Sequence, residues 1–171
     1  MIIDDADLVK VLKQLILENE DELVRDMVFQ TKKKTINQLV TNNLTDDMSG
    51  LFVRITIPES EARLADGSDS LWIGEYSVSI DVVDYARMQQ MDDEPYEIVT
   101  EQFRVFIGKL VELIKNQKGW LAGERGRYRR PVDRTRQRIK KRDDSDWYPD
   151  ESGNLYATCF GKISFYFEGQ C

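Results

Sequence analysis

Apolar and polar residues alternate in two central segments of the chain, which is the spacing of β-strands with one buried face. Every second position is apolar in residues 51–57, and we expect Pro58 to end that strand. The same alternation returns over residues 72–85. Because residues 59–70 between them are mostly polar, the pattern predicts an antiparallel hairpin with a long, exposed arm.

Two other segments carry apolar residues at helical spacing. Residues 6–18 present one apolar stripe on an otherwise charged background, and Asp4 or Asp5 suits the helix start. Residues 95–117 give the clearest helix, which Gly119 is expected to stop. This helix must bury its apolar face, most simply against the sheet.

The segments between these elements are less regular. Residues 20–41 fit a second helix, although residues 27–30 also fit an extended segment, and residues 143–154 are acidic and turn-like. We therefore expect a single α+β domain over residues 1–171, with residues 119–154 forming a charged insertion or hairpin region within it. Its antiparallel or mixed β-sheet is packed by an amphipathic helix, with an N-terminal helix and a long β-hairpin arm.

The final segment, residues 155–169, is apolar on both faces of a predicted strand. Tyr156, Phe160 and Tyr166 fall on the face opposite the one that carries Ile163. A strand with aromatic residues on both faces is expected to be covered twice, by the helix and by another subunit.

Positive charge is concentrated in one short segment of an acidic chain. Residues 125–142 hold ten of the 24 Lys and Arg residues and one acid, a local charge of +9, whereas the whole chain is −7 and the remainder is therefore −16. From Arg134 to Lys140 every second residue is basic, which predicts a strand with one charged face that pairs with the C-terminal strand. The candidate interface or channel residues of this segment are Arg127, Arg129, Arg130, Arg134, Arg136, Arg138, Lys140, Lys141 and Arg142.

This basic segment has two open interpretations. Its arginines can pair with acids inside the protein or along an oligomer seam, or they can contact nucleic-acid phosphates. Tyr128 and Trp147 could stack on bases, and they suit anchors in a protein interface equally well. Gly123 and Gly126 favour a flexible loop over a phosphate cradle, because no strand precedes them and no helix follows.

The absence of histidine limits the chemistry available to the chain. It removes Ser–His and Cys–His nucleophile pairs and His metal ligands. Cys159 and Cys171 are too few for a zinc site, and no structural disulfide is expected. We expect no catalytic residue, no metal and no cofactor. The N-terminus lacks a secretory signal and no apolar run spans a bilayer, so we expect a soluble protein made in a cytoplasm.

A metal-dependent nuclease is the enzyme class that the missing histidine leaves open. Asp81 and Asp84 lie near the end of a predicted strand, where carboxylates could hold Mg²⁺. Asp150 and Lys162 fail to complete a PD…(D/E)xK pattern, because Phe160 stands where an acid is needed. We therefore interpret Asp150 as a turn residue and rank this class last.

The order of these segments resembles the tail terminator (tail completion, or minor tail) proteins of long-tailed bacteriophages. The matching parts are the N-terminal helix, the strand LFVRITI, the segment WIGEYSVSIDVVDYA, the helix EIVTEQFRVFIGKLVELIKN and the final strand LYATCFGKISFYFEG. The resemblance implies an α+β subunit of a six-fold ring that caps the tail tube and presents a surface to the head-side connector. It implies no catalytic residues.

The resemblance also implies where partners bind. The arm and the basic segment would line subunit interfaces or the central channel through which DNA passes. The candidate interface residues of the arm are Glu59, Glu61, Arg63, Asp66 and Asp69. The expected location is the tail or neck of a virion, assembled in a host cytoplasm. The alternatives are another head–tail neck subunit, such as a stopper or adaptor, and a nucleic-acid-binding module that uses residues 125–142.

Overall fold

The computed structural model describes most of the chain as an α+β fold. The described residues are 5–25, 28–29, 32–33, 36–38, 50–88, 93–130, 140–149 and 155–170, with side chains placed in 5–25, 53–82, 101–130 and 161–170. The helices are α1 (Asp5–Glu18), α2 (Glu20–Leu23) and α3 (Asp93–Lys115). The strands are β1 (Val28–Phe29), β2 (Lys32–Lys33), β3 (Ile36–Gln38), β4 (Gly50–Leu64), β5 (Trp72–Met88), β6 (Leu121–Ala122), β7 (Arg127–Arg129), β8 (Lys140–Pro149) and β9 (Leu155–Gln170).

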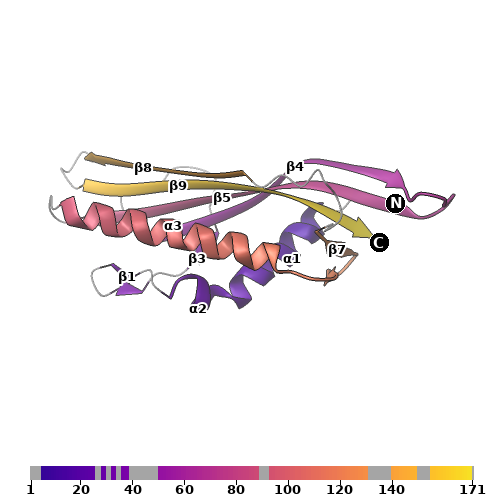
Figure 1. The fold of residues 1–171 in the computed structure, drawn as a ribbon, viewed down its shortest axis with the longest axis horizontal. Helices are drawn as coiled ribbons and strands as arrows, with labels where there is room; N and C mark the ends of the chain where they lie inside the picture. Colours follow the sequence, from indigo (N-terminus) through magenta and orange to yellow (C-terminus); the bar gives the residue numbers. More distant parts are fainter. Residues whose placement is uncertain are drawn as a thin grey trace.

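One mixed sheet forms the body of the molecule. Its strand order is β3-β4-β5-β9-β7-β6, and β8 also pairs with β9; β1 and β2 form a separate two-stranded sheet. Only the β3–β4 pair is parallel among the described pairs. The long strands β4, β5 and β9 run the length of the molecule, and α1 and α3 lie along one side of the sheet (Figure 1). At one end, the pairing of β4 with β5 continues to Leu64 and Trp72, past the last pair of β5 with β9 at Gly74 and Gly169 (Figure 1); we refer to this end of the hairpin as the arm.

Strand β4 is longer than the sequence predicted, because Pro58 does not end it. Thr56 lies opposite Ser79 and Glu59 lies opposite Ser77, so one extra residue of β4 is accommodated between these pairs as a bulge. Proline is tolerated at a bulge because it has no N–H to give to the ladder. The polar residues 59–64 are therefore strand, and only residues 65–71 form the connection.

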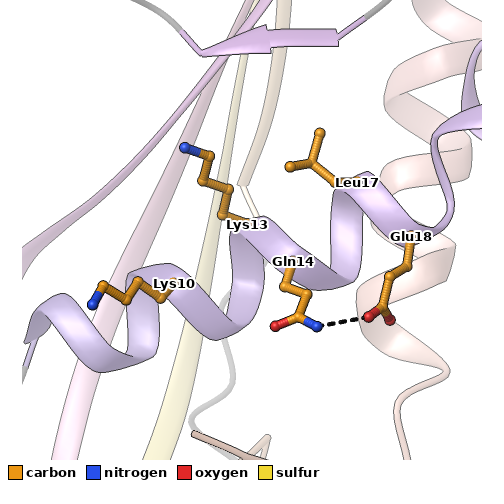
Figure 2. A pocket seen from close by; sticks show the side chains of 5 residues that line it. All are labelled: Lys10, Lys13, Gln14, Leu17 and Glu18. Carbon is orange, nitrogen blue, oxygen red and sulfur yellow. Dashed lines mark hydrogen bonds between the residues drawn. The ribbon is translucent and has the colours of Figure 1, made fainter. Parts of the chain in front are cut away.

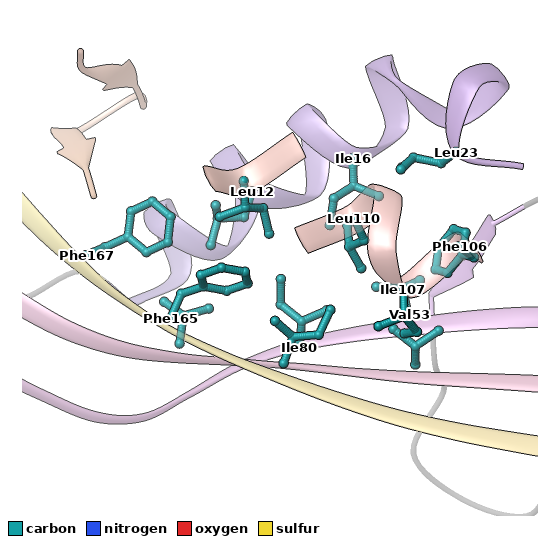
Figure 3. Packing of buried hydrophobic residues seen from close by; sticks show 14 of the residues in the cluster. Leu12, Ile16, Leu23, Val53, Ile80, Phe106, Ile107, Leu110, Phe165 and Phe167 are labelled. Atoms are coloured by element: carbon teal, nitrogen blue, oxygen red, sulfur yellow. The ribbon is translucent and has the colours of Figure 1, made fainter. Parts of the chain in front are cut away.

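The hydrophobic core lies between the sheet and the two helices (Figure 3). Helix α3 places Phe106, Ile107 and Leu110 there, each with 0% of its surface exposed. Leu12 of α1 and Ile80 of β5 are equally buried, so both helices and the sheet share one core. Burying a side chain of this size contributes roughly 1.5–3 kcal/mol each. The predicted apolar stripes of both helices are confirmed where side chains are described.

Helix α3 begins at Asp93, slightly before the predicted start, and ends at Lys115. Gly119 follows with φ of 76°, a conformation that glycine adopts without strain, and the chain turns there toward β6. In the irregular segment 20–41, the helix is limited to Glu20–Leu23, and the described residues after it are extended in Val28–Phe29, Lys32–Lys33 and Ile36–Gln38. The extended alternative for 27–30 holds for Val28–Phe29, and a second helix that continues through residues 32–38 is wrong.

The C-terminal strand β9 pairs with β8, which begins at Lys140, the last residue of the predicted partner strand; residues 134–139 of that strand lie outside the described part. Strand β8 runs from Lys140 to Pro149 along β9, so residues 143–149 are strand and not the expected turn. On the helix side of β9, Ile163, Phe165 and Phe167 are buried. On its other side Lys162 is exposed, and coverage of that side by another subunit stays a prediction.

Candidate functional site

A buried carboxylate joins helix α1 to the hairpin formed by β6 and β7. Asp7 lies in the first turn of α1 with 4% of its surface exposed. Its Oδ1 accepts the N–H of Glu124 at 3.0 Å, and its Oδ2 accepts the N–H of Arg125 at 3.2 Å and the hydroxyl of Tyr128 at 2.7 Å. The turn between β6 and β7 is therefore a cradle of donors for one anion.

The glycines of this turn allow the carboxylate to approach. The N–H of Gly123 donates to the carbonyl of Gly126 at 2.7 Å and closes the turn. A Cβ at Gly123 would overlap the Asp7 carboxylate. This hydrogen-bonded turn replaces the flexible loop that the sequence favoured. It does cradle an anion, but that anion is a side chain of the same protein.

Hydrogen bonding also controls the ionisation of Asp7. Burial opposes the charged form, but the Tyr128 hydroxyl and the N–H groups of Arg125, Glu124 and Gly126 hold the pKa of Asp7 below its usual value. The Asp7 carboxylate is therefore charged at neutral pH and accepts these hydrogen bonds. We call the hydrogen bonds between Asp7 of α1 and the β6–β7 hairpin the clamp. The sequence analysis missed this residue, which read as an ordinary acid at a helix start.

The Tyr128 hydroxyl donates to Asp7, and the Tyr128 ring belongs to the hydrophobic core. Its exposed fraction is 2%, and its ring meets that of Tyr76 edge to face with centroids 5.8 Å apart. Both alternatives for Tyr128, stacking on nucleic-acid bases and anchoring a protein interface, are therefore wrong, because the side chain is buried within its own chain. The side chain of Trp147, the other candidate for stacking, lies outside the described residues.

The described residues of the basic segment fall into two parts, one around β7 and one in β8. Arg127 and Arg129 are exposed on β7 and flank the ring of Trp120, with guanidinium carbons 5.1 and 4.5 Å from its centroid. Arg127 also donates to Gln170 Oε1 at 3.2 Å, and Arg130 donates to the carbonyl of Lys115 at 2.5 Å.

In the second part of the basic segment, the structure describes the backbone but not the side chains. Lys140, Lys141 and Arg142 begin β8, where their backbones pair with residues 162–164 of β9. Arg134, Arg136 and Arg138 lie outside the described residues, and so does their predicted charged face. The two described parts of the segment therefore meet β9 at separate places, β7 at its C-terminal end and β8 further back.

Charged residues brace the base of the arm. Glu75 of β5 lies directly opposite Glu168 of β9, an arrangement that repels on its own. Arg63 of β4 lies 2.6 Å from Glu75 and 4.0 Å from Glu168, and Arg129 approaches Glu168 from the other side at 3.4 Å. The two glutamate side chains are 12% and 7% exposed, whereas Arg63 and Arg129 are 31% and 46% exposed, so solvent screens these pairs in part. The row ties four neighbouring strands together.

The five predicted arm residues therefore have different roles. Arg63 belongs to the ion-pair row, whereas Glu59 and Glu61 are exposed on β4. Asp66 and Asp69 are exposed in the connecting turn, where Gly67 adopts φ of 75°.

Asp81, the candidate metal ligand of the nuclease alternative, has a structural partner. Its Oδ2 lies 3.0 Å from Nη2 of Arg54 on the neighbouring strand. The side chains of Asp84 and Asp150 lie outside the described residues. Among the side chains that are described, no three carboxylates or thiols gather as a metal site.

A shallow hollow of about 370 Å³ runs along α1, lined by Lys10, Lys13, Gln14, Leu17 and Glu18. Leu17 is 43% exposed, and Gln14 donates to Glu18 at 2.9 Å across one helical turn (Figure 2). The lining belongs to a single helix, and it brings no reactive groups together.

Two further observations concern the chain as a whole. None of the helices in the described part is long and apolar enough to cross a bilayer. No protein-family model and no curated protein sequence matches the chain.

Proposed function

We propose that this protein is a structural subunit of a phage tail, which forms a ring, caps the tail tube and joins it to the head-side connector. The single observation that carries the proposal is the braced hairpin arm. It extends beyond the sheet and ends in exposed Leu64, Leu71 and Trp72 (Figure 1). Exposed apolar side chains of this size, concentrated at one tip, are typical of contact surfaces.

The base of the arm supports this proposal. The row of Arg63, Glu75, Glu168 and Arg129 links β4, β5, β9 and β7, and it lies where the arm leaves the sheet. A hairpin held at its base presents its tip in a defined position, so less conformational entropy is lost when a partner binds. A mobile loop would not offer that advantage.

The contacts of the basic segment favour an interface over a dedicated nucleic-acid site. Arg129 pairs with the carboxylate of Glu168, so the chain itself matches one of these positive charges. Arg127 donates a hydrogen bond to the neutral side chain of Gln170. DNA in a ring channel remains a partner for the residues outside the described part. Mutating Arg134, Arg136 and Arg138 to Ala together would then weaken DNA binding and flatten its salt dependence.

The experiment that tests the proposed function is loss of the gene product in the phage that encodes it, followed by electron microscopy of the particles. Tail termination predicts overlong tails with tubes of variable length. Filled heads that leak DNA would instead identify a stopper or adaptor. Normal tails on intact, filled particles would refute both roles.

A further inference from the structure

The tip of the hairpin arm, residues 64–72, combines apolar and acidic side chains. Leu64, Leu71 and Trp72 are 42%, 46% and 41% exposed, and they are three of the five large apolar side chains most exposed among the described residues. Leu64 lies directly opposite Trp72 in the strand register, so the two side chains share one face of the arm. Asp66 and Asp69 give this tip a net charge of −2.

The conformation of the tip is fixed by its own hydrogen bonds. The N–H of Ala65 donates to the carbonyl of Leu71 at 2.7 Å, and the N–H of Ser68 donates to the carbonyl of Ala65 at 3.0 Å. The Oγ of Ser68 accepts the N–H of Leu71 at 2.9 Å. Together with the ion-pair row at its base, these bonds make the arm a preformed ligand.

A surface of opposite character lies on the β6–β7 hairpin. Trp120 is half-buried, the guanidinium groups of Arg127 and Arg129 both lie close to its ring, and Arg125 is exposed on the connecting turn. Residues 120–130 hold four arginines and one glutamate, a net charge of +3. Glu168 pairs with Arg129 at 3.4 Å, which leaves a net charge of +2 at this surface. We call Trp120 with Arg125, Arg127 and Arg129 the Trp120 surface.

We propose that the arm tip of one copy of this chain docks onto the Trp120 surface of a second copy. Asp66 and Asp69 meet the arginines, and Trp72 and Leu71 cover the indole ring of Trp120. Trp and Arg are the residues most enriched at the centres of interfaces, and both are present. This inference rests on the proposed function in that it names the surface that joins neighbouring subunits.

The two surfaces differ, so each copy can donate one tip and accept another. Such contacts either close between two copies or propagate around a ring. The tip has nine residues, fewer than the roughly 20–30 residues per partner of a standard interface. We therefore expect a concentration-dependent equilibrium of the purified chain, which further contacts strengthen in the assembled particle.

Sedimentation velocity of the full chain, over a wide concentration range, tests this contact. One variant carries Asp66→Lys and Asp69→Lys, and the other carries Arg125→Glu and Arg127→Glu. Each alone places like charges in contact, so we expect its self-association to weaken at least about tenfold. Mixed in equal amounts, the two variants have complementary charges and should associate again at low salt. Lys10→Glu with Lys13→Glu, an equal change of charge on α1, is the matched control and should leave association unchanged.

Each result of these experiments supports or overturns the proposed contact between the arm tip and the Trp120 surface. A wild-type chain that stays monomeric at every concentration overturns it, and so does a mixture of the two variants that fails to associate. Rings that form equally well from both variants would also overturn this contact, while leaving the proposed function intact. Conversely, if the charge-reversal pattern is found but loss of the protein leaves phage tails normal, the contact stands and the proposed function fails.

Discussion

The clamp between Asp7 and the β6–β7 turn leads to a quantitative prediction for stability. Asp7→Asn removes the charge and one acceptor oxygen while keeping the side-chain shape. Hydrogen bonds to a charged group contribute about 1.5–3 kcal/mol each, and a buried donor left unpaired costs a similar amount. Because the Tyr128 hydroxyl and the N–H groups of Glu124 and Arg125 all donate to the carboxylate, we expect the free energy of unfolding to fall by about 2–3 kcal/mol. For a chain of this length that lowers Tm by roughly 5–10 °C.

Thermal and urea unfolding, followed by circular dichroism, measure this change. Asp5→Asn is the matched control, because it removes the same charge from the same first turn of α1. It reports the helix-dipole contribution, about 0.5 kcal/mol, together with the effect of changing its own buried Oδ1. Tyr128→Phe removes one donor, and the double variant with Asp7→Asn should show coupling of about 1 kcal/mol.

The same clamp predicts how stability depends on pH. The pKa of Asp7 is lower in the folded than in the unfolded chain, so its contribution is complete above the ordinary value of 3.8. It is lost as pH falls below 3.8 and through the folded-state pKa. Asp7→Asn should therefore be less stable at neutral pH and should approach the wild type in strong acid. An Asp7→Asn protein as stable as Asp5→Asn at neutral pH would refute the reasoning.

Two further predictions concern the turn and the base of the arm. Gly123→Ala should destabilise the fold by about 2–3 kcal/mol, because its Cβ would overlap the Asp7 carboxylate. Gly108→Ala is its control: nothing lies within 4 Å of a Cβ in this helical position, so we expect about 0.5–1 kcal/mol of stabilisation. Arg63→Leu should lower the free energy of unfolding by about 2 kcal/mol, because Glu75 and Glu168 then lie opposite each other with one arginine fewer between them. Arg25→Leu, which breaks an exposed pair, should cost at most about 0.5 kcal/mol. Urea unfolding of the four variants measures all these values, and equal losses for Arg63 and Arg25 would contradict the proposed bracing.

The sequence predicted the main elements because their signals are local. Alternation in 51–57 and 72–85 reports one buried face of a strand, and the apolar stripe of 95–117 reports one buried face of a helix. The strand end predicted at Pro58 is wrong, because a bulge can accommodate a proline that a regular ladder cannot. The strand character of 59–64 was hidden because Glu59, Glu61 and Arg63 make one face charged, and the other face has no large apolar residue before Leu64.

The clamp and the ion-pair row could not be predicted in the same way. Asp7 and Tyr128 are 121 positions apart, and no periodicity links an acid on a helix to a distant turn. Only the spacing of Gly123 and Gly126 carried a signal for anion binding, and it did not identify the anion. The partners of Arg129 likewise depend on strand order, which places β7 beside β9.

The proposed function is tested most directly by electron microscopy of the purified full chain, alone and mixed with phage tail tubes. The account predicts rings at high protein concentration and a ring seated on one end of each tube. Single small particles at every concentration, with bare tube ends in the mixture, would contradict it.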